Sequence, residues 1–335
     1  MKHILIGGQG FLGRETCRQL IERGGADVVV VDLPEAFARF PKASIERVRY
    51  VEADISKPGA LEGIRLDPDD TVHHLATKLI TPNEPRFGRD AYFNICAVDG
   101  TREVLAWMKR QGSRRLVFWS TDMVYGPAVV VPRPESHPRR PFGPYGRSKV
   151  RAEDIVAASV AGGDVTCTVF RPRLILGPGR LGILQVLFRL IEKNRPVPLI
   201  GPGRNRFQFV SVSDCARATI RAADLGCPNG IYNLGSENSP TEYELMTEFI
   251  ARVGSRSRII RTPGMLVKMV LRGLNLLKIA PMDPEQFEIA DLEVQLDISA
   301  AKRDLGWQPL HSDTDLLTAA YRAYRGEAAV VVGAD

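Results

Sequence analysis

Short apolar runs alternate along the first half of the chain with longer stretches in which apolar residues recur every three or four positions. Such runs are typical of strands, and the longer stretches are typical of helices. The predicted strands are 4–6, 28–32, 48–51, 71–75, 116–120 and 167–171, and the main predicted helices are 10–23, 94–111 and 145–158. Because alternating strands and helices form βαβ units, we predict the α/β class with a doubly wound parallel sheet of the Rossmann type.

The second predicted strand indicates a sheet that is covered on both faces. Positions 28–31 are four successive valines, whereas a strand with one face in water alternates apolar and polar residues. We therefore expect helices on both sides of this strand.

The domain organisation follows from where the alternation weakens. After position 172, glycine and proline cluster at 177–179 and 201–203, and such clusters mark loops. We expect a dinucleotide-binding domain over 1–174, whose sheet is completed by a strand, a helix and a second strand within 207–235. A smaller C-terminal cap for the substrate is expected from 175–206 and 236–325, followed by a loosely held tail over 326–335.

A glycine-rich turn joins the first predicted strand to the first predicted helix. Gly7, Gly10 and Gly13 form the pattern G-x-x-G-x-x-G, with Phe11 and Leu12 in the same loop. Glycine allows a tight turn and a close backbone approach, and the following helix presents N–H groups and a positive dipole end to a pyrophosphate. The pattern therefore favours dinucleotide binding over an ordinary turn.

Acidic residues after the second and third predicted strands bear on the dinucleotide. Asp32 lies where a carboxylate accepts hydrogen bonds from both hydroxyls of an adenosine ribose and repels a 2′-phosphate. No arginine follows within the next few residues, so NAD is favoured over NADP. Asp54, beside Ile55, either holds the edge of the adenine or caps the next turn.

Tyr145 and Lys149 lie four residues apart on a predicted helix and therefore share one face. The ammonium of Lys149 can stabilise the phenolate of Tyr145 and lower its pKa from about 10. A tyrosine tuned in this way can take the proton from a substrate hydroxyl while hydride leaves the same carbon for nicotinamide. Taken alone, the spacing fits equally well a tyrosine and a lysine that face solvent.

Two hydroxyl residues, Ser120 and Thr121, stand at the carboxyl end of the predicted strand 116–120. Ligands bind at this edge of a doubly wound sheet. Thr121 is therefore predicted to hydrogen-bond the reacting oxygen of the substrate, with Ser120 nearby.

In this order the motifs resemble those of the extended short-chain dehydrogenase/reductases, the NAD-dependent epimerase/dehydratase family, over the chain to about residue 325. Further matching segments are 74–76, 94–101, 144–149, 171–172, 297–298 and 302–307. The resemblance implies an enzyme with bound NAD and a homodimer formed through the helices 94–111 and 145–158. It implies catalytic roles for Tyr145, Lys149, Thr121 and Ser120, and further cofactor contacts from Leu75, Ala76, Asn94 and Pro172.

Two positions depart from the family's patterns and bear on the reaction. Sugar dehydratases of the family carry an acid and then usually a glutamate after the hydroxyl residue, but here Asp122 is followed by Met123, which accepts no proton. Dehydration and decarboxylation are thus disfavoured. Nucleotide-sugar enzymes often carry an asparagine where this chain has Leu174, after Arg173. The run 171–179 is closer to 3β-hydroxysteroid dehydrogenases and to epimerases of polyprenyl-linked sugars.

These features lead us to expect an NAD-dependent epimerase of a sugar nucleotide, with C4 as the expected carbon and a transient keto intermediate. The alternatives are an NAD-dependent dehydrogenase of a hydroxysteroid or another lipid alcohol, an epimerase of a polyprenyl-linked sugar, and a non-enzymatic NAD-sensing module. The sensor is disfavoured because it needs no tuned phenol. Substrate contacts are expected from Asp122, Met123 and Arg173.

Two segments of the predicted cap bear on the ligand. Arg206, within 204–206, can bind a diphosphate through its guanidinium fork, and the alternative is a solvated loop. The stretch 265–280 is apolar apart from a stripe of lysine, arginine and asparagine at 268, 272, 275 and 278. It either meets an anionic membrane surface or a lipid-like substrate, or it is a buried cap or dimer helix, and it is too short to span a bilayer.

Composition and charge bear on the expected partners, metal content and compartment of the protein. The net charge of +6 suits anionic ligands, but the arginines are dispersed without the interleaved aromatics of a nucleic-acid module, so no nucleic-acid partner is expected. The five cysteines show neither a C-x-x-C pair nor metal-ligand spacing, so we expect a reduced, cytoplasmic protein without a metal. The N-terminus lacks the basic region and cleavage site of a secretory signal.

Overall fold

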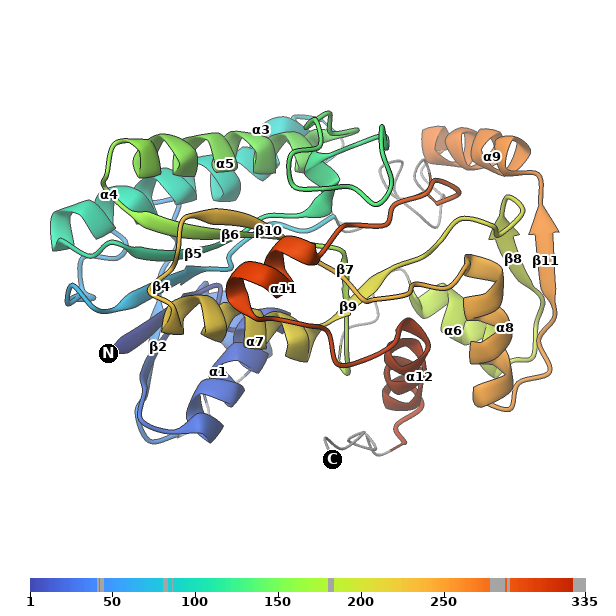
Figure 1. Ribbon diagram of the computed structural model, residues 1–335, viewed down its shortest axis with the longest axis horizontal. Helices are drawn as coiled ribbons and strands as arrows, with labels where there is room; N and C mark the ends of the chain where they lie inside the picture. The colour runs from blue at the N-terminus through green and yellow to red at the C-terminus, as the bar shows by residue number, and fades with distance from the viewer. Residues whose placement is uncertain are drawn as a thin grey trace.

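A seven-stranded parallel sheet forms the centre of the computed structural model (Figure 1). The model describes residues 1–40, 42, 45–80, 84–85, 87–179, 184–277, 287 and 290–327. Across the sheet the strands run in the order β10 (Gly230–Leu234), β6 (Thr166–Pro172), β5 (Arg115–Trp119), β4 (Thr71–His74), β1 (Lys2–Ile6), β2 (Asp27–Asp32) and β3 (Val48–Glu52). The four valines of β2 are buried, as expected of a strand with helices on both faces.

Helices cover both faces of this sheet, which confirms the predicted doubly wound fold (Figure 1). One face carries α3 (Arg89–Asn94), α4 (Thr101–Gln111) and α5 (Pro144–Ala161), and the other carries α1 (Phe11–Arg23), α7 (Val212–Asp224) and α11 (Ser299–Leu305). The short α2 (Pro34–Arg39) follows β2. The helix predicted over 94–111 is interrupted, because a π-helical turn, Ile95–Gly100, lies between α3 and α4.

The smaller cap is built on its own apolar core, at the right of Figure 1. Its helices are α6 (Leu184–Glu192), α8 (Glu242–Arg252), α9 (Gly264–Leu277) and α12 (Asp313–Tyr324). Two parallel strand pairs accompany them, β8 (Val197–Ile200) with β11 (Ile259–Thr262), and β7 (Leu174–Leu176) with β9 (Phe209–Ser211).

The region 207–235 differs in part from the sequence prediction. β10 is an edge strand of the main sheet and α7 packs against α1. The first predicted strand of this region, however, is β9, which pairs with β7 outside the main sheet. Its partner β7 follows β6 directly along the chain but lies outside the main sheet, and β9 lies there with it. The tail from position 328 lies outside the described residues.

The chain order across the sheet reverses between β1 and β4. At such a point the loops after the two strands diverge and leave a crevice at the carboxyl edge of the sheet. The glycine turn follows β1, Leu75 follows β4, and Ser120 follows β5. The fold thus brings three of the predicted motifs to one edge.

A buried ion pair joins α5 to β6 near the carboxyl edge of the sheet. Arg171 donates to Glu153 through Nε at 2.9 Å and through Nη2 at 2.6 Å, and the two side chains are 2% and 4% exposed. Ser120 donates to the same carboxylate at 2.5 Å and Arg139 donates at 3.1 Å. The Glu153 carboxylate thus joins α5 to three other segments: β6, the loop after β5, and the loop that carries Arg139.

Replacing Glu153 by glutamine should destabilise the fold, because Arg171 would keep its charge in a buried position without a carboxylate. We expect the free energy of unfolding to fall by about 3 kcal/mol in urea denaturation. Glu22→Gln is the matched control, since Glu22 forms an exposed ion pair with Arg18 and should cost less than about 1 kcal/mol. Equal losses in the two variants would contradict this account of the buried pair.

Candidate active site

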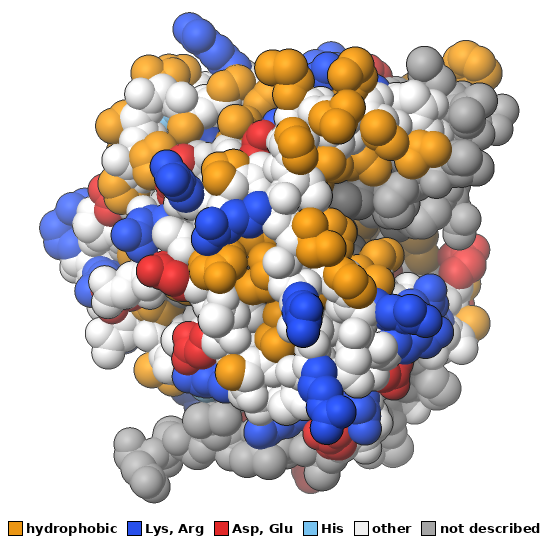
Figure 2. All heavy atoms as spheres, turned by 90° about the vertical axis from the view of Figure 1, so that its right-hand side faces the viewer, with side chains coloured by type: hydrophobic (Ala, Val, Ile, Leu, Met, Phe, Trp, Pro, Cys, Tyr) orange, Lys and Arg blue, Asp and Glu red, His pale blue; other side chains and the backbone are white. Residues whose placement is uncertain are grey.

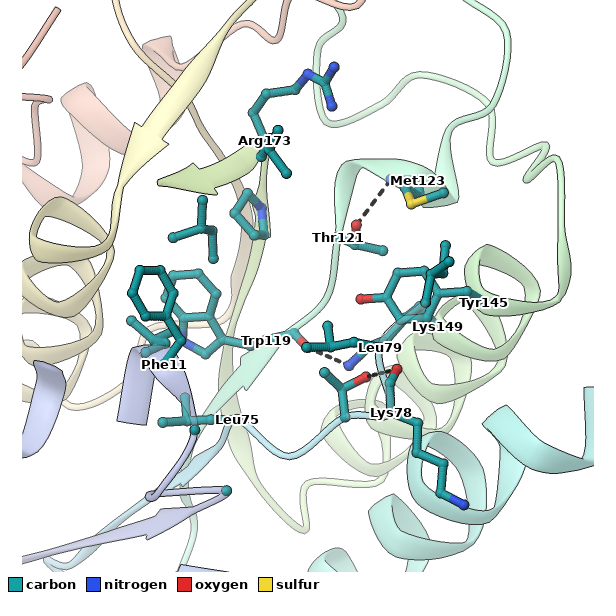
Figure 3. Close-up of a pocket in the computed structure, with 18 of the residues that line it drawn as sticks. Phe11, Leu75, Lys78, Leu79, Trp119, Thr121, Met123, Tyr145, Lys149 and Arg173 are labelled. Atoms are coloured by element: carbon teal, nitrogen blue, oxygen red, sulfur yellow. Dashed lines mark hydrogen bonds between the residues drawn. The ribbon is translucent and has the colours of Figure 1, made fainter. Parts of the chain in front are cut away.

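One cavity of about 1090 Å³ runs from the glycine turn past α5 into the cap. Figure 3 shows its central part, where side chains from the sheet edge face those of α5. Most of the residues predicted from the sequence line it: Gly7, Gly10, Phe11, Leu12, Gly13, Asp32, Asp54, Ile55, Leu75, Ala76, Ser120, Thr121, Asp122, Met123, Tyr145, Lys149, Pro172 and Arg173.

The glycine turn is packed too closely for larger residues and suits a pyrophosphate. Gly7 has a φ of +83°, which favours glycine, and a Cβ there would lie 2.6 Å from the backbone nitrogen of Ala76. A Cβ on Gly13 would lie 2.5 Å from the Cα of Gly8. α1 begins without a side-chain cap hydrogen bond and without an acid in its first turn, so its positive end suits the pyrophosphate of NAD.

Asp32 is held at the end of β2 by backbone donors. Its Oδ2 accepts from the N–H of Gln9 and its Oδ1 from the N–H of Leu33, both at 2.9 Å. Burial raises the pKa of Asp32, and these N–H groups oppose the rise. A carboxylate fixed in this way, in the wall of the cavity, fits the predicted contact with the ribose hydroxyls of NAD.

Asp54 caps the next turn, one of the two roles that its sequence position left open, and its contact with adenine stays a prediction. It lines the cavity, and its Oδ1 also accepts from the N–H of Ser56 at 3.0 Å and from its hydroxyl at 2.6 Å. Burial alone would raise the pKa of Asp54, but these hydrogen bonds hold it below its ordinary value. The adjacent Ile55 is buried and lines the same part of the cavity.

Arg39 and Phe40 also line the cavity, and the sequence analysis missed them. The guanidinium of Arg14 lies 3.7 Å from the centre of the Phe40 ring, and that of Arg39 lies 5.3 Å from it. Both residues are at the end of α2, outside any motif, so only the tertiary fold reveals that they lie beside the dinucleotide site.

Tyr145 lies near the start of α5, and its side chain is 8% exposed. Its ring packs edge-on against Phe93, with ring centres 5.6 Å apart. Figure 3 shows the phenol oxygen directed into the cavity, with the Thr121 hydroxyl and the Lys149 ammonium on either side of it in this view. The solvent-facing alternative for Tyr145 and Lys149 is therefore wrong.

Lys149 is a buried cation one turn further along α5. Its Nζ donates to the backbone oxygen of Trp119 at 2.9 Å and lies 5.4 Å from the centre of the Phe118 ring. Burial lowers the pKa of Lys149 to about 8, although interactions with Cys96 and Glu153 raise it. At neutral pH the side chain is therefore mostly charged, and its charge favours phenolate beside it.

The two hydroxyl residues after β5 are placed differently. Thr121 Oγ1 accepts from the N–H of Met123 at 3.2 Å, and its hydroxyl faces the cavity in Figure 3. Ser120 donates instead to Glu153 within the buried network. This geometry favours Thr121 for contact with a reacting oxygen and favours Ser120 as a residue that positions the loop.

Asp122 and Arg173 form a second buried ion pair in the wall of the cavity. Arg173 Nη1 donates to Asp122 Oδ2 at 2.9 Å, and the side chains are 6% and 7% exposed. The Arg173 guanidinium also lies 5.4 Å from the centre of the Phe207 ring, on the cap side. Its Nε is buried and has no hydrogen-bond partner among the described residues. Arg173 therefore carries one unused donor at the boundary between the two parts of the cavity.

The cap side of the cavity is mainly apolar. Among the described lining residues from position 172 onward, only Arg173 and Glu242 carry ionisable side chains. The apolar members include Leu174, Leu184, Leu187, Leu190, Val197, Leu199, Phe207, Met246, Val267 and Leu271. Glu242 was missed by the sequence analysis, because a glutamate in the first turn of a helix is ordinarily a favourable surface residue.

Two predicted site residues do not line the cavity. Asn94 accepts a hydrogen bond from Arg151 at 3.1 Å on the outer side of the helical layer. Arg206 is exposed and donates to the backbone oxygen of Ser239. Their predicted contacts with the cofactor and the substrate stay predictions.

Helix α9 carries the predicted polar stripe, of which Arg272 and Asn275 are exposed. Lys268 pairs with Asp291 and its side chain is 13% exposed. The exposed side chains include Met265, Leu266, Met269 and Val270, and Figure 2 shows apolar side chains gathered over this part of the cap. Positions 278–280 lie outside the described residues. The predicted membrane contact of 265–280 stays a prediction.

Within the described ranges, no group of three or more histidine, cysteine, aspartate or glutamate side chains is arranged to hold a metal ion. No helix in the same ranges is long and apolar enough to cross a membrane.

Residues 3–235 match the model of the NAD dependent epimerase/dehydratase family. A putative UDP-glucose 4-epimerase of Methanocaldococcus jannaschii is 26% identical over 91% of this chain and 92% of its own length. A 2-alkyl-3-oxoalkanoate reductase of Stenotrophomonas maltophilia is 28% identical over 76% of each chain. The structure of a UDP-glucose 4-epimerase from Thermotoga maritima superposes with a TM-score of 0.74 at 23% identity, over 97% of this chain and 99% of that one.

Replacing Lys149 by methionine should change how stability depends on pH. The folded protein gives Lys149 a pKa of about 8, against an ordinary value of 10.5 in the unfolded chain. Between these values the unfolded state binds more protons, so this lysine makes the free energy of unfolding rise with pH. The gain of the Lys149→Met variant over the wild type should therefore be greatest below pH 8 and shrink by a few kcal/mol towards pH 10.

The measurement is urea unfolding of the NAD-free proteins at intervals between these two pH values. Lys109→Met is the matched control, because Lys109 is 67% exposed in a surface ion pair. A difference between Lys149→Met and the wild type that stays constant with pH would show that Lys149 is not a buried, strained cation.

Proposed function

The chain belongs to the NAD-dependent epimerase/dehydratase family and is an NAD-dependent enzyme, and from that premise we propose that it is a 4-epimerase of a sugar nucleotide. The observation that carries the proposal is the composition of the cavity. Tyr145, Lys149 and Thr121 gather where a secondary alcohol can be oxidised, and Arg173 brings an unused buried donor to the same cavity. A donor of this kind suits a phosphate oxygen.

The names of relatives support this choice of reaction. The relative from M. jannaschii is named as a putative UDP-glucose 4-epimerase, and the alignment spans nearly the whole of both chains. At 26% identity the shared reaction type is a better guide than the particular sugar. We therefore propose reaction at C4, and incubation with different sugar nucleotides identifies the sugar.

The residues of the chain divide the chemistry as follows. The glycine turn and Asp32 would hold NAD, which would supply the acceptor for the hydride of the substrate carbon. Tyr145 takes the hydroxyl proton as the hydride leaves and gives it back when the alcohol re-forms. Lys149 favours the phenolate form of Tyr145, and Thr121 holds the reacting oxygen by a hydrogen bond. Epimerisation requires in addition that the keto sugar turn within the cavity before the hydride returns.

Met123 favours epimerisation over dehydration. Elimination of water from a keto sugar needs a base that removes a proton from the neighbouring carbon. Met123 lines the cavity one residue beyond Asp122, and its thioether accepts no proton. Asp122 is already paired with Arg173, so it is a poor substitute for the missing base.

A second candidate function is oxidation or reduction of a lipid alcohol. The observation that favours it is the apolar cap side of the cavity, including Leu174, together with a relative named as a 2-alkyl-3-oxoalkanoate reductase. In this case NADH would accumulate with a hydroxysteroid or a long-chain alcohol. The exposed apolar residues of α9 would suit substrates drawn from a membrane surface.

Two structural expectations accompany the proposal. We propose a dinucleotide-binding domain over 1–174 with 207–235 and a substrate cap over 175–206 and 236–325, of which α11 packs on the main sheet. We also propose a homodimer through the helices that contain 94–111 and 145–158. Sedimentation of the purified protein tests the second expectation.

The proposed function is tested by incubating the purified protein with UDP-, GDP- and dTDP-sugars, without added NAD. Anomeric proton NMR and the absorbance of NADH are followed in the same tube. Interconversion of two sugars without lasting NADH is the expected result. NADH that accumulates with a hydroxysteroid, and no change in any sugar, would instead select the second candidate.

Replacing Tyr145 by phenylalanine should lower kcat by about 10³-fold, because the group that exchanges the substrate proton is lost. NAD content after purification should stay near that of the wild type, since the phenol is one of many lining groups. Tyr324→Phe is the control, because that phenol contacts Glu192 on the surface of the cap. Full activity in the Tyr145→Phe variant would sink the assignment of the proton carrier.

A further inference from the structure

A buried carboxylate oxygen without a partner lies on the cap side of the cavity. Glu242 Oε2 is buried and accepts no hydrogen bond from any described residue. Among the buried side-chain atoms of the described chain that lack a partner, only this oxygen and Arg173 Nε belong to residues that line the cavity. A buried polar atom without a partner costs about 1–3 kcal/mol, so a polar partner brought to these side chains by a ligand would stabilise the complex.

Glu242 is fixed in place by the backbone around it. It is the first residue of α8, its N–H donates to the backbone oxygen of Asn205 at 2.8 Å, and Met246 lies one turn further along the same lining face. Phe207 and Leu199 line the same side of the cavity. The carboxylate is thus one polar group among flat and branched apolar side chains, an environment that suits a nucleobase.

A series of contacts connects the loop of Thr121 to Glu242 through Arg173 and Phe207. Asp122, next to Thr121, pairs with Arg173, and the Arg173 guanidinium lies over the ring of Phe207. The N–H of Phe207 donates to the backbone oxygen of Pro240 at 3.2 Å, two residues before Glu242. These contacts run from the loop of Thr121 through Arg173 and Phe207 to the start of α8.

This order matches the order of groups in a sugar nucleotide. The sugar belongs at Tyr145 and Thr121, the diphosphate at Arg173, and the base at the far end, beside Phe207 and Glu242. Neighbouring charges do not satisfy Glu242: Lys268 is already paired with Asp291. Burial raises the pKa of Glu242 to about 7, a hydrogen bond with Asn205 opposes this, and the charge of Asp291 adds to it.

We propose that Glu242 binds the base of the substrate and selects guanine, so that the sugar nucleotide is a GDP-sugar. This inference rests on the proposed function. Guanine presents two adjacent donors, the ring N1–H and the 2-amino group, and a carboxylate can accept from both. Uracil and thymine present a single N–H between two carbonyl oxygens, and those oxygens repel a carboxylate. A bidentate pair of this kind discriminates by roughly 10-fold or more between bases.

Binding of free nucleotides tests the inference without turnover. Isothermal titration of the NAD-loaded wild type with GDP, UDP and dTDP should give a Kd for GDP at least about 10-fold lower than for the other two. Glu242→Gln should lose most of this preference, because its amide presents a donor to the N1–H or to the amino group of guanine. Its affinity for UDP should be unchanged or higher, since the amide N–H can donate to a uracil oxygen.

Glu237→Gln is the matched control, because Glu237 pairs with Lys302 on the surface and should leave all three Kd values unchanged. UDP or dTDP binding as tightly as GDP to the wild type would overturn the role of Glu242 and leave the sugar-nucleotide function standing. An unchanged GDP preference in Glu242→Gln would do the same. Failure of all three nucleotides to bind the wild type would overturn both the inference and the proposed function.

Discussion

The ion pair between Arg171 and Glu153 is the constraint on which the rest of the site depends. It is almost completely buried, so neither partner can be lost without leaving an unpaired charge in the core. The pair holds α5, which carries Tyr145 and Lys149, against β6, which leads directly to Arg173 and the cap. Because Ser120 donates to the same carboxylate, the loop that bears Thr121 is set in the same frame. A single carboxylate therefore fixes both halves of the proton-transfer machinery relative to each other.

Lys149 shows how that frame alters chemistry. A lysine at this depth is costly, and the cost appears as a pKa lowered to about 8 by burial. The protein tolerates the charge because the Trp119 carbonyl and the Phe118 ring face the ammonium. A phenolate at Tyr145 would lower the electrostatic cost of this buried charge, since the two charges are opposite. In the proposed mechanism, stability and catalysis would thus be coupled at Lys149, because a phenolate at Tyr145 would offset part of the cost of burying the cation.

The sequence was sufficient where local spacing carries the chemistry. The glycine turn, Asp32, and the tyrosine and lysine one helical turn apart each follow from rules that act over a few residues, and the parallel sheet then brings them to one edge. It was insufficient where partners come from distant segments. Arg39 and Phe40 belong to no motif, and the unsatisfied oxygen of Glu242 is visible only once α8 packs over the cavity. The role of α9 was left open because most of its residues are apolar, so periodicity alone could not say what covers its exposed apolar side chains.

The two unsatisfied atoms also weigh the candidate functions against each other. An apolar cap alone favours a lipid alcohol, which would gain burial along its whole length. Such a ligand, however, would leave the buried Arg173 Nε and Glu242 Oε2 without partners, as they are in the ligand-free protein. A ligand that is apolar in its flat faces and polar at two spaced points can instead supply those partners, each worth about 1–3 kcal/mol. A nucleotide joined to a sugar through a diphosphate has this distribution of polarity.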